Sequence, residues 1–107
     1  MKEKAFKLRA DEIREIAVGY GACFATDHIT VEGRKVGFMY REEPDRPIDS
    51  GWRFFSGEEA QEYVDDLENT AIYDVNTIAN YDPAIIPYLS APPGSAFGRE
   101  GEKFVPE

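Results

Sequence analysis

The sequence contains few of the residues that support covalent or acid–base chemistry. Its 107 residues include one cysteine, Cys23, and one histidine, His28. A single cysteine excludes a disulfide within the chain and a multi-cysteine zinc cluster. A catalytic thiol–imidazole pair needs hydrogen-bonding contact and a third, orienting group, and the sequence identifies no such group. Because a buried cysteine commonly serves as a small apolar residue, we predict no catalytic residues.

Motifs for metals and nucleotides are also missing. The sequence has no HExxH, no paired histidines and no EF-hand loop. Residues 94–98, GSAFG, lack the lysine and the strand-to-helix setting of a phosphate-binding loop. These absences predict no metal site, no cofactor and no enzymatic activity.

Positive charge is scarce. Twelve basic residues stand against 21 acidic ones, which leaves a formal net charge of −9 at pH 7. Nucleic-acid binding depends on Lys and Arg side chains that displace counterions, so we expect no nucleic-acid partner. An acidic surface speeds encounter with a basic protein, although the same charge also serves solubility without any partner.

Long hydrophobic runs are absent as well. No segment approaches the roughly 20 apolar residues of a membrane span. Residues 1–17 hold no apolar run of the length that a signal peptide needs. We therefore expect no membrane association and a cytoplasmic location.

The residues that are present predict a packed core. Hydrophobic residues make up 42% of the chain and aromatic residues 13%, well above the range of disordered proteins. Alternation and turn signals predict strands at 21–26, 35–41, 52–55, 71–75 and 95–99. The predicted fold class is α+β: a single small domain with a mainly antiparallel sheet of four to five strands, packed on one face by an amphipathic helix.

That helix is predicted at 57–68. Ser56 followed by Glu59 matches a capping box, in which each of the two side chains bonds a backbone amide near the helix start. Apolar residues then recur at helical spacing and form one stripe: Ala60, Tyr63, Val64 and Leu67. We expect the aromatic strand at 52–55 to lie under this stripe.

The two ends of the chain are predicted to lie outside the main domain. Apolar spacing at 8–17 predicts a short helix, so residues 1–20 are assigned to a helical extension. Residues 21–100 form the α+β domain, and 101–107 are expected to be a disordered tail.

Three segments in order resemble a known family. They are KVGFMYREEPD with DSGWRFFSGEE, then IYDVNTIANYDP, then PGSAFGR. This set closely resembles immunity protein family 33 of bacterial polymorphic toxin systems, over about residues 20–99. The resemblance implies a small α+β domain that protects the producing cell by binding a cognate toxin, and it carries no catalytic assignment.

On this basis the leading hypothesis is a non-catalytic, acidic binding protein, monomeric or weakly dimeric, that docks on a basic toxin domain. The acids expected to meet the partner are Glu42, Glu43, Asp45, Asp49, Glu58, Glu59, Glu62, Asp65 and Asp66. The alternative is a small-molecule or peptide sensor, or an enzyme, built around a polar and aromatic pocket. Its candidate residues are Arg41, Trp52, Arg53, Asp74, Asn76 and Tyr81.

Overall fold

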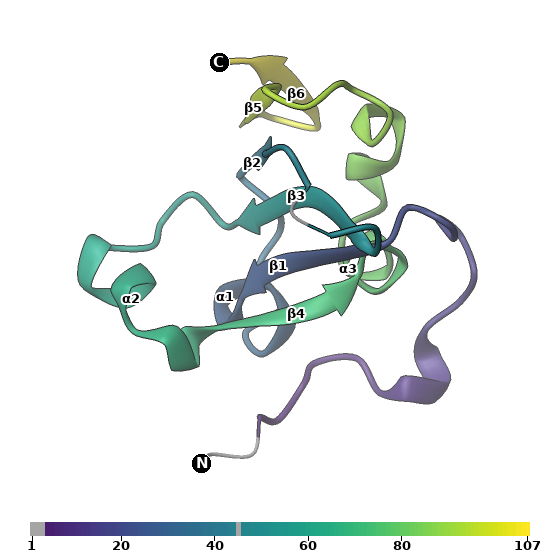
Figure 1. Cartoon of the computed structure of the whole chain (residues 1–107). Helices are drawn as coiled ribbons and strands as arrows, with labels where there is room; N and C mark the ends of the chain where they lie inside the picture. The colour runs from purple at the N-terminus through teal and green to yellow at the C-terminus, as the bar shows by residue number, and fades with distance from the viewer. Residues whose placement is uncertain (1–3, 45) are drawn as a thin grey trace.

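A six-stranded sheet forms the centre of the molecule (Figure 1). The computed structural model describes residues 4–44 and 46–107. Its strands are β1 (Ala22–Thr26), β2 (Phe38–Arg41), β3 (Asp49–Phe55), β4 (Thr70–Asp74), β5 (Ala96–Glu100) and β6 (Lys103–Pro106), in the spatial order β4-β1-β3-β2-β5-β6. Neighbouring strands pair antiparallel, except that β1 and β3 pair parallel. The predicted α+β class is confirmed, with one strand more than expected.

Short helices connect the strands. They are η1 (Ala10–Glu12), α1 (Asp27–Thr30), α2 (Gln61–Asp65), η2 (Leu67–Asn69), α3 (Val75–Tyr81) and η3 (Pro83–Tyr88), where η marks a 3-10 helix. Asp74 starts α3, because its side chain accepts from the Asn76 amide, and Asp82 starts η3 in the same way, followed by Pro83. In the described part of the chain, no helix has the length and apolar character needed to span a membrane.

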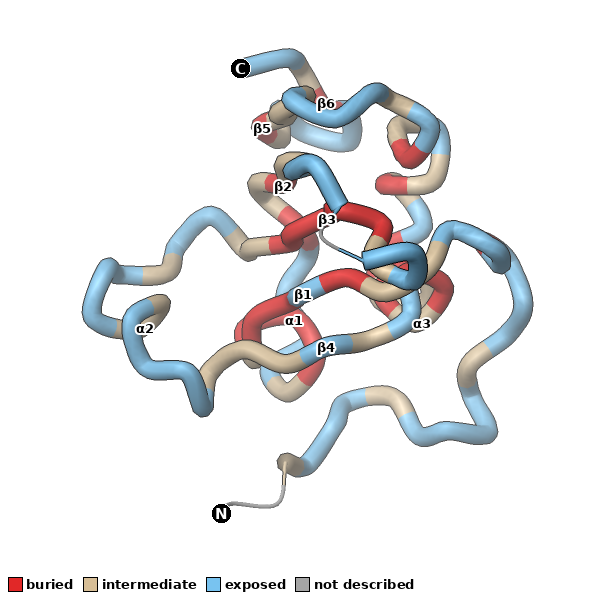
Figure 2. Tube along the Cα trace, in the orientation of Figure 1, coloured by how far each residue is buried: buried red, intermediate tan, exposed pale blue. Residues whose placement is uncertain are grey.

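The core lies on one face of the sheet, under α1, α3 and η3. Trp52 and Phe54 of β3 are fully buried and belong to one apolar cluster with Ile78 of α3 and Leu89, which follows η3. The Trp52 indole nitrogen donates to the Leu89 carbonyl over 3.1 Å, so the largest core side chain has its polar atom bonded. Figure 2 shows the buried stretches of the chain gathered along β1, β3 and the helices behind them.

The prediction of a helix over 57–68 is wrong. Glu59 accepts hydrogen bonds from the Ser56 and Gly57 amides, and the Ser56 hydroxyl accepts from the Glu58 amide. These bonds resemble the predicted capping box, but they close a turn, and α2 begins only at Gln61. Leu67 is 86% exposed, so the expected apolar stripe does not pack across the sheet. The sheet is instead covered by α3, whose pattern is too short for periodicity to identify.

Both predictions for the chain ends need correction. Residues 8–17 contain only the three-residue η1, because the backbone there bonds side chains of α3: Asn76 accepts from the Ile16 and Ala17 amides, and Asn80 from the Arg14 amide. The expected disordered tail contains β6, which pairs with β5. Burial of Phe104 against Tyr88 gives this last strand an apolar anchor.

Candidate functional site

The opposite face of the sheet carries a row of large side chains that no helix covers within the described residues. Strand register aligns Ile72 of β4 with Phe24 of β1, Phe24 with Arg53 of β3, and Arg53 with Tyr40 of β2. We call the surface around Phe24, Tyr40, Arg53, Phe55 and Ile72 the open face. Phe24 is 37% exposed and Ile72 65% exposed, whereas Cys23 and Ala25, on either side of Phe24 in β1, are buried in the core.

Alternation along the strands explains why this face exists. Successive side chains of a strand point to opposite sides of a sheet, so Trp52 and Phe54 enter the core while Arg53 and Phe55 emerge on the other side. A sheet with one packed face normally places polar residues on its solvent side. Here the solvent side carries aromatic and aliphatic residues, a kind of surface that is common where proteins bind one another.

Arg53 lies at the centre of the open face. Its guanidinium is 4.6 Å from the centre of the Phe24 ring, a cation–π distance. It donates to Glu42 over 2.9 Å and to both carboxylate oxygens of Asp49 over 3.1 Å. Burial lowers the pKa of Arg53, but the hydrogen bonds to Asp49 and Glu42 outweigh burial and raise it. The Arg53 guanidinium is therefore fixed in position, and it orients the two carboxylates on this face.

Aromatic rings extend the open face on one side of Arg53. Tyr40 and Phe55 stack with centroids 5.8 Å apart and an interplanar angle of 11°, and Phe38 lies 5.8 Å from Tyr40 and 6.1 Å from Phe55. Burial, followed by the nearby Glu42 carboxylate, raises the pKa of Tyr40. The phenol therefore stays neutral and offers a hydroxyl beside the acidic loop.

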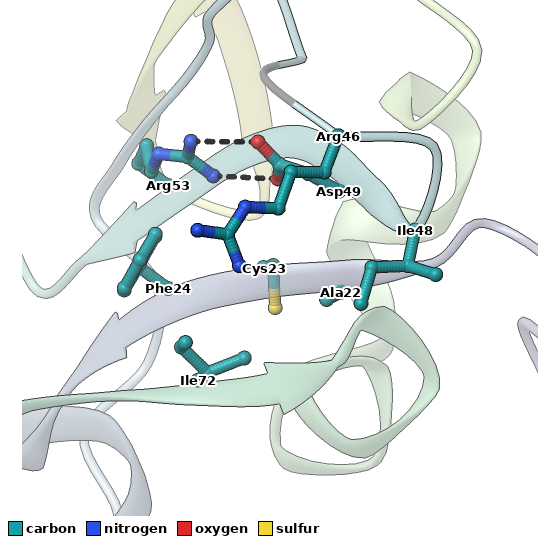
Figure 3. A pocket seen from close by; sticks show the side chains of 8 residues that line it. All are labelled: Ala22, Cys23, Phe24, Arg46, Ile48, Asp49, Arg53 and Ile72. Carbon is teal, nitrogen blue, oxygen red and sulfur yellow. Dashed lines mark hydrogen bonds and ion pairs between the residues drawn. The ribbon is translucent and has the colours of Figure 1, made fainter.

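Several hollows mark the open face, and two of them are lined by Phe24 and Ile72. The first, with a volume of about 260 Å³, is shown in Figure 3, where Arg46 leans over a floor that includes Phe24, Ile48 and Ile72. The second, of about 550 Å³, lies between this row and the side chains of Val64 and Leu67. The exposed Leu67 thus borders the open face, which explains an apolar residue at that position.

The predicted partner-binding acids fall into two groups. Six are exposed: Glu42, Glu43, Glu58, Glu62, Asp65 and Asp66. Of these, Glu42 pairs with Arg53 and Glu58 with Arg34. Asp49 is mostly buried beneath Arg53, and Asp45 lies outside the described residues.

Glu59, which we predicted to be a partner-binding acid, has a buried side chain. Its side chain is 4% exposed and accepts from the Thr26 hydroxyl as well as from two backbone amides. Burial raises the pKa of Glu59, but these hydrogen bonds to the ionised form outweigh burial and lower it. Glu59 therefore joins β1 to the segment before α2 and has no face free for a partner.

The six residues of the predicted pocket do not line one cavity. The Arg41 guanidinium lies 5.9 Å from the Trp52 ring on the core side and donates to the Ser50 and Ala91 carbonyls. Arg53 faces the opposite side. Asp74 caps α3, while Asn76 and Tyr81 bond the backbone of the N-terminal segment. Polar and aromatic residues interleaved along a strand are thus divided between its two faces.

One cluster resembles the residues of a hydrolase but lacks the geometry. His28 Nδ1 lies 2.7 Å from Ser56 Oγ and 3.7 Å from Glu59 Oε2, so the hydroxyl and the carboxylate approach the same ring nitrogen. A serine triad needs them on opposite nitrogens, where the acid orients the imidazole and the imidazole accepts the serine proton. Cys23 is no alternative nucleophile, because burial, followed by the nearby Asp74 carboxylate, raises the pKa of its thiol.

Sequence reasoning missed Phe24, Tyr40 and Ile72 as site residues. A signal existed at Phe24, the only large residue in the predicted strand GACFAT, flanked by small residues on both sides. Alternation would have placed Phe24 opposite Cys23 and Ala25, but only the packed structure shows which of these sides the helices cover.

The comparisons with known proteins agree with the observed domain. The family model described as the Immunity protein Imm33 domain matches residues 23–106, which includes β6 and extends beyond the 20–99 expected from the resemblance. No curated protein and no solved structure matches the chain. With most of its length matched, from β1 to the last strand, the chain belongs to the Imm33 immunity protein domain family.

Proposed function

We propose that this immunity protein neutralises a cognate toxin by binding it directly with the open face, in the cytoplasm of the producing cell. Membership of the Imm33 family supports an immunity role. The observation that carries the proposed surface is the row of Ile72, Phe24, Arg53 and Tyr40, which crosses four strands in the middle of an otherwise acidic protein.

The open face contains the two kinds of residue that commonly supply binding energy: apolar side chains that a partner can bury and a pre-organised arginine. Phe24, Tyr40 and Ile72 are partly exposed apolar or aromatic side chains that a partner can bury, and such central residues supply most binding energy. Arg53 is pre-organised by Asp49 and Glu42, so it loses little freedom on binding.

Acids at the rim would act on the rate of binding. Glu42 and Glu43 lie on the loop after β2, and Glu62, Asp65 and Asp66 lie on or beside α2, which borders the open face. Rim charges chiefly raise the association rate toward a partner of opposite charge. The proposed toxin therefore presents a basic surface with an apolar centre, and its binding weakens as salt is added.

The small-molecule alternative has less support. A ligand pocket usually has a volume of about 300–1,000 Å³ and encloses most of its ligand. The hollow of Figure 3, at about 260 Å³, falls just below that range. The second hollow, at about 550 Å³, falls within it, but it is lined by the exposed Leu67 and Ile72 and so does not enclose a ligand. The residues predicted for a pocket are also dispersed over both faces, so protein docking accounts better for the exposed row.

A pull-down from the native cell, with the protein as bait, tests the proposed function. We expect a stable protein partner with wild-type bait and about tenfold less of it with Phe24→Ser, because interface aromatics commonly contribute more than about 1 kcal/mol. Phe6→Ser is the matched control: Phe6 is 46% exposed, against 37% for Phe24, but lies on the N-terminal segment. Recovery of no partner, or equal losses with both variants, would contradict the proposal.

A further inference from the structure

The two edges of the sheet differ in how they are protected. β6, at one edge, carries Lys103 and Pro106, and charged residues and proline are devices that prevent further strand pairing. β4, at the other edge, reads Thr-Ala-Ile-Tyr-Asp and contains neither lysine nor proline. Its central Ile72 is 65% exposed. An unprotected edge strand with an exposed apolar residue is a template for a further strand.

Hydrogen-bond register shows which groups of β4 are available. The Val75 amide donates to the Gly21 carbonyl, and in an antiparallel pair the bonded positions alternate. Ala71 and Tyr73 therefore face β1, whereas the amides and carbonyls of Thr70 and Ile72 point away from the sheet. Within the described residues, these outward groups of Ile72 have no hydrogen-bond partner.

Space lies beside both halves of this edge. A groove of about 790 Å³ separates residues 4–6 of the N-terminal segment from η2 and the start of β4, including Thr70 and Ala71. A second hollow, of about 520 Å³, is lined by Gly19 and by Ile72, Tyr73 and Asp74 at the other end of the strand. Residues 4–20, the described part of the N-terminal segment, therefore leave the edge of β4 accessible.

We propose that two copies of this chain pair through β4, antiparallel and centred on Ile72, to form one continuous sheet. The strand is self-complementary in this register. Ile72 meets Ile72 of the second copy on the open face, and Thr70 lies opposite Asp74 of the second copy, where its hydroxyl can donate to the carboxylate. On the covered face, the small Ala71 meets the large Tyr73, and no two like charges are directly opposed.

We expect this dimer to be weak, because its interface is small and both chains are negatively charged. A five-residue strand pair forms a small interface, for which we expect a dissociation constant on the order of tens of micromolar. Each chain carries a net charge of −9, so the two copies repel one another at low salt. Added salt screens this repulsion and strengthens the dimer, whereas it weakens binding to a basic toxin. The opposite salt dependence separates self-association from the proposed function.

Sedimentation velocity of the full chain over a range of concentrations tests the proposal. We expect the weight-average mass to rise from monomer to dimer, with a lower dissociation constant at high salt. Ile72→Lys places two positive charges face to face at the two-fold axis and is expected to raise the dissociation constant at least about tenfold. Ile16→Lys is the matched control, since Ile16 is 43% exposed but lies on the N-terminal segment, where its amide donates to Asn76 of α3.

An oxidative cross-link tests the register itself. Hydrogen-bonded residues opposite one another in an antiparallel pair have Cα atoms about 5.5 Å apart, within the range of a disulfide. Ile72→Cys should therefore give a covalent dimer under mild oxidation, and Ile16→Cys should not, while the native Cys23 is buried. Circular dichroism confirms that each variant is folded. A wild-type chain that stays monomeric at high concentration and high salt, or cross-linking that is equal in both cysteine variants, would overturn the proposal.

Discussion

The two faces of the sheet are built by the same strands, yet they differ in how far they are withdrawn from water. On the covered face, Trp52 and Phe54 are fully buried and the polar atoms are paired inside the protein, as in the ion pair of Asp82 with Arg99. On the open face, Phe24 and Ile72 remain partly exposed. Free energy of folding comes mainly from apolar area removed from water. The covered face therefore supplies most of the stability of the domain, and the open face is the surface proposed for binding.

An apolar residue in a strand therefore does not always contribute to the stability of the fold. Phe24 and Phe54 are both phenylalanines in neighbouring, paired strands, but only Phe54 is enclosed on all sides. Substitutions at matched positions on the two faces test whether this division holds.

The largest effect is expected from removal of a core ring. Phe54→Ala should lower the free energy of unfolding by about 3–5 kcal/mol, because it removes a fully buried side chain and leaves a cavity. Phe24→Ala should cost less than about 1 kcal/mol, since the ring is already partly in water. Urea denaturation followed by the fluorescence of Trp52, the only tryptophan, measures both. Equal losses would remove the distinction between the faces.

Loss of an ion pair should also lower the free energy of unfolding more on the covered face than on the open face. Asp82 is 2% exposed in its side chain and accepts from Arg99 and from the Val36 amide. Asp82→Ala leaves these donors unpaired and should cost about 3 kcal/mol or more of unfolding free energy.

Loss of the open-face cation should cost less. Arg53→Met removes one partner of Asp49, which still accepts from the Gly51 amide, and one of Glu42, which is 52% exposed and can be solvated, so we expect about 1–2 kcal/mol. Chemical denaturation at neutral pH measures both ion-pair variants, and a larger loss for Arg53→Met than for Asp82→Ala would contradict the comparison.

Glu59 should make a pH-dependent contribution where α2 meets the sheet. Its pKa is lowered from the ordinary value of 4.5, so its stabilisation is fully present above that value and is lost as pH falls through the lower pKa of the folded state. Glu59→Gln should therefore cost about 1 kcal/mol at pH 7, with a difference from wild type that shrinks below pH 4.5.

The exposed Glu62, on the same segment, supplies the matched control for this titration. Glu62→Gln should leave the free energy of unfolding nearly unchanged from neutral to acidic pH. Thermal melts of the three proteins across that range give the comparison. A constant offset between Glu59→Gln and wild type would show that the carboxylate charge is not responsible.

The smallest effect on stability is expected from the rim acids. Asp65→Asn combined with Asp66→Asn should change the free energy of unfolding by no more than about 0.5 kcal/mol, because both side chains are exposed. The association rate with the partner recovered by pull-down should nevertheless fall severalfold at low salt, with little change in the dissociation rate. An unchanged association rate would place the interface away from α2.

Much of the strand content could be predicted from the chain alone. Predicted strands at 21–26, 71–75 and 95–99 differ by only one residue at an end from β1, β4 and β5, because alternating apolar residues bounded by turn signals are local features. The strand at 52–55 in fact starts at Asp49, where the Ser50 hydroxyl bonds the Ala22 carbonyl and the Asp49 carboxylate holds Arg53. The Ala22 carbonyl lies 28 residues from Ser50 in the sequence, so the local pattern does not show where this strand starts.

Helices were harder to predict than strands because their limits depend on distant groups. Ser56 and Glu59 fit a capping box, yet Thr26 of β1 binds the same Glu59 carboxylate, and the segment stays a turn. The N-terminal segment has helical spacing, but Asn76 and Asn80 bond its backbone in an extended path. In each case a side chain from another element satisfies the backbone or carboxylate groups that an isolated helix would have used.

The order of residues by itself determined the α+β class, most strand positions, the acidic charge and the resemblance to the family, since these depend on local pattern and composition. Only the tertiary structure decided that Phe24, Tyr40, Arg53 and Ile72 share an uncovered surface and that Glu59 does not reach it. The physical reason is that strand alternation assigns residues to two sides of a sheet, whereas the packing of α3 and η3 decides which side is withdrawn from water.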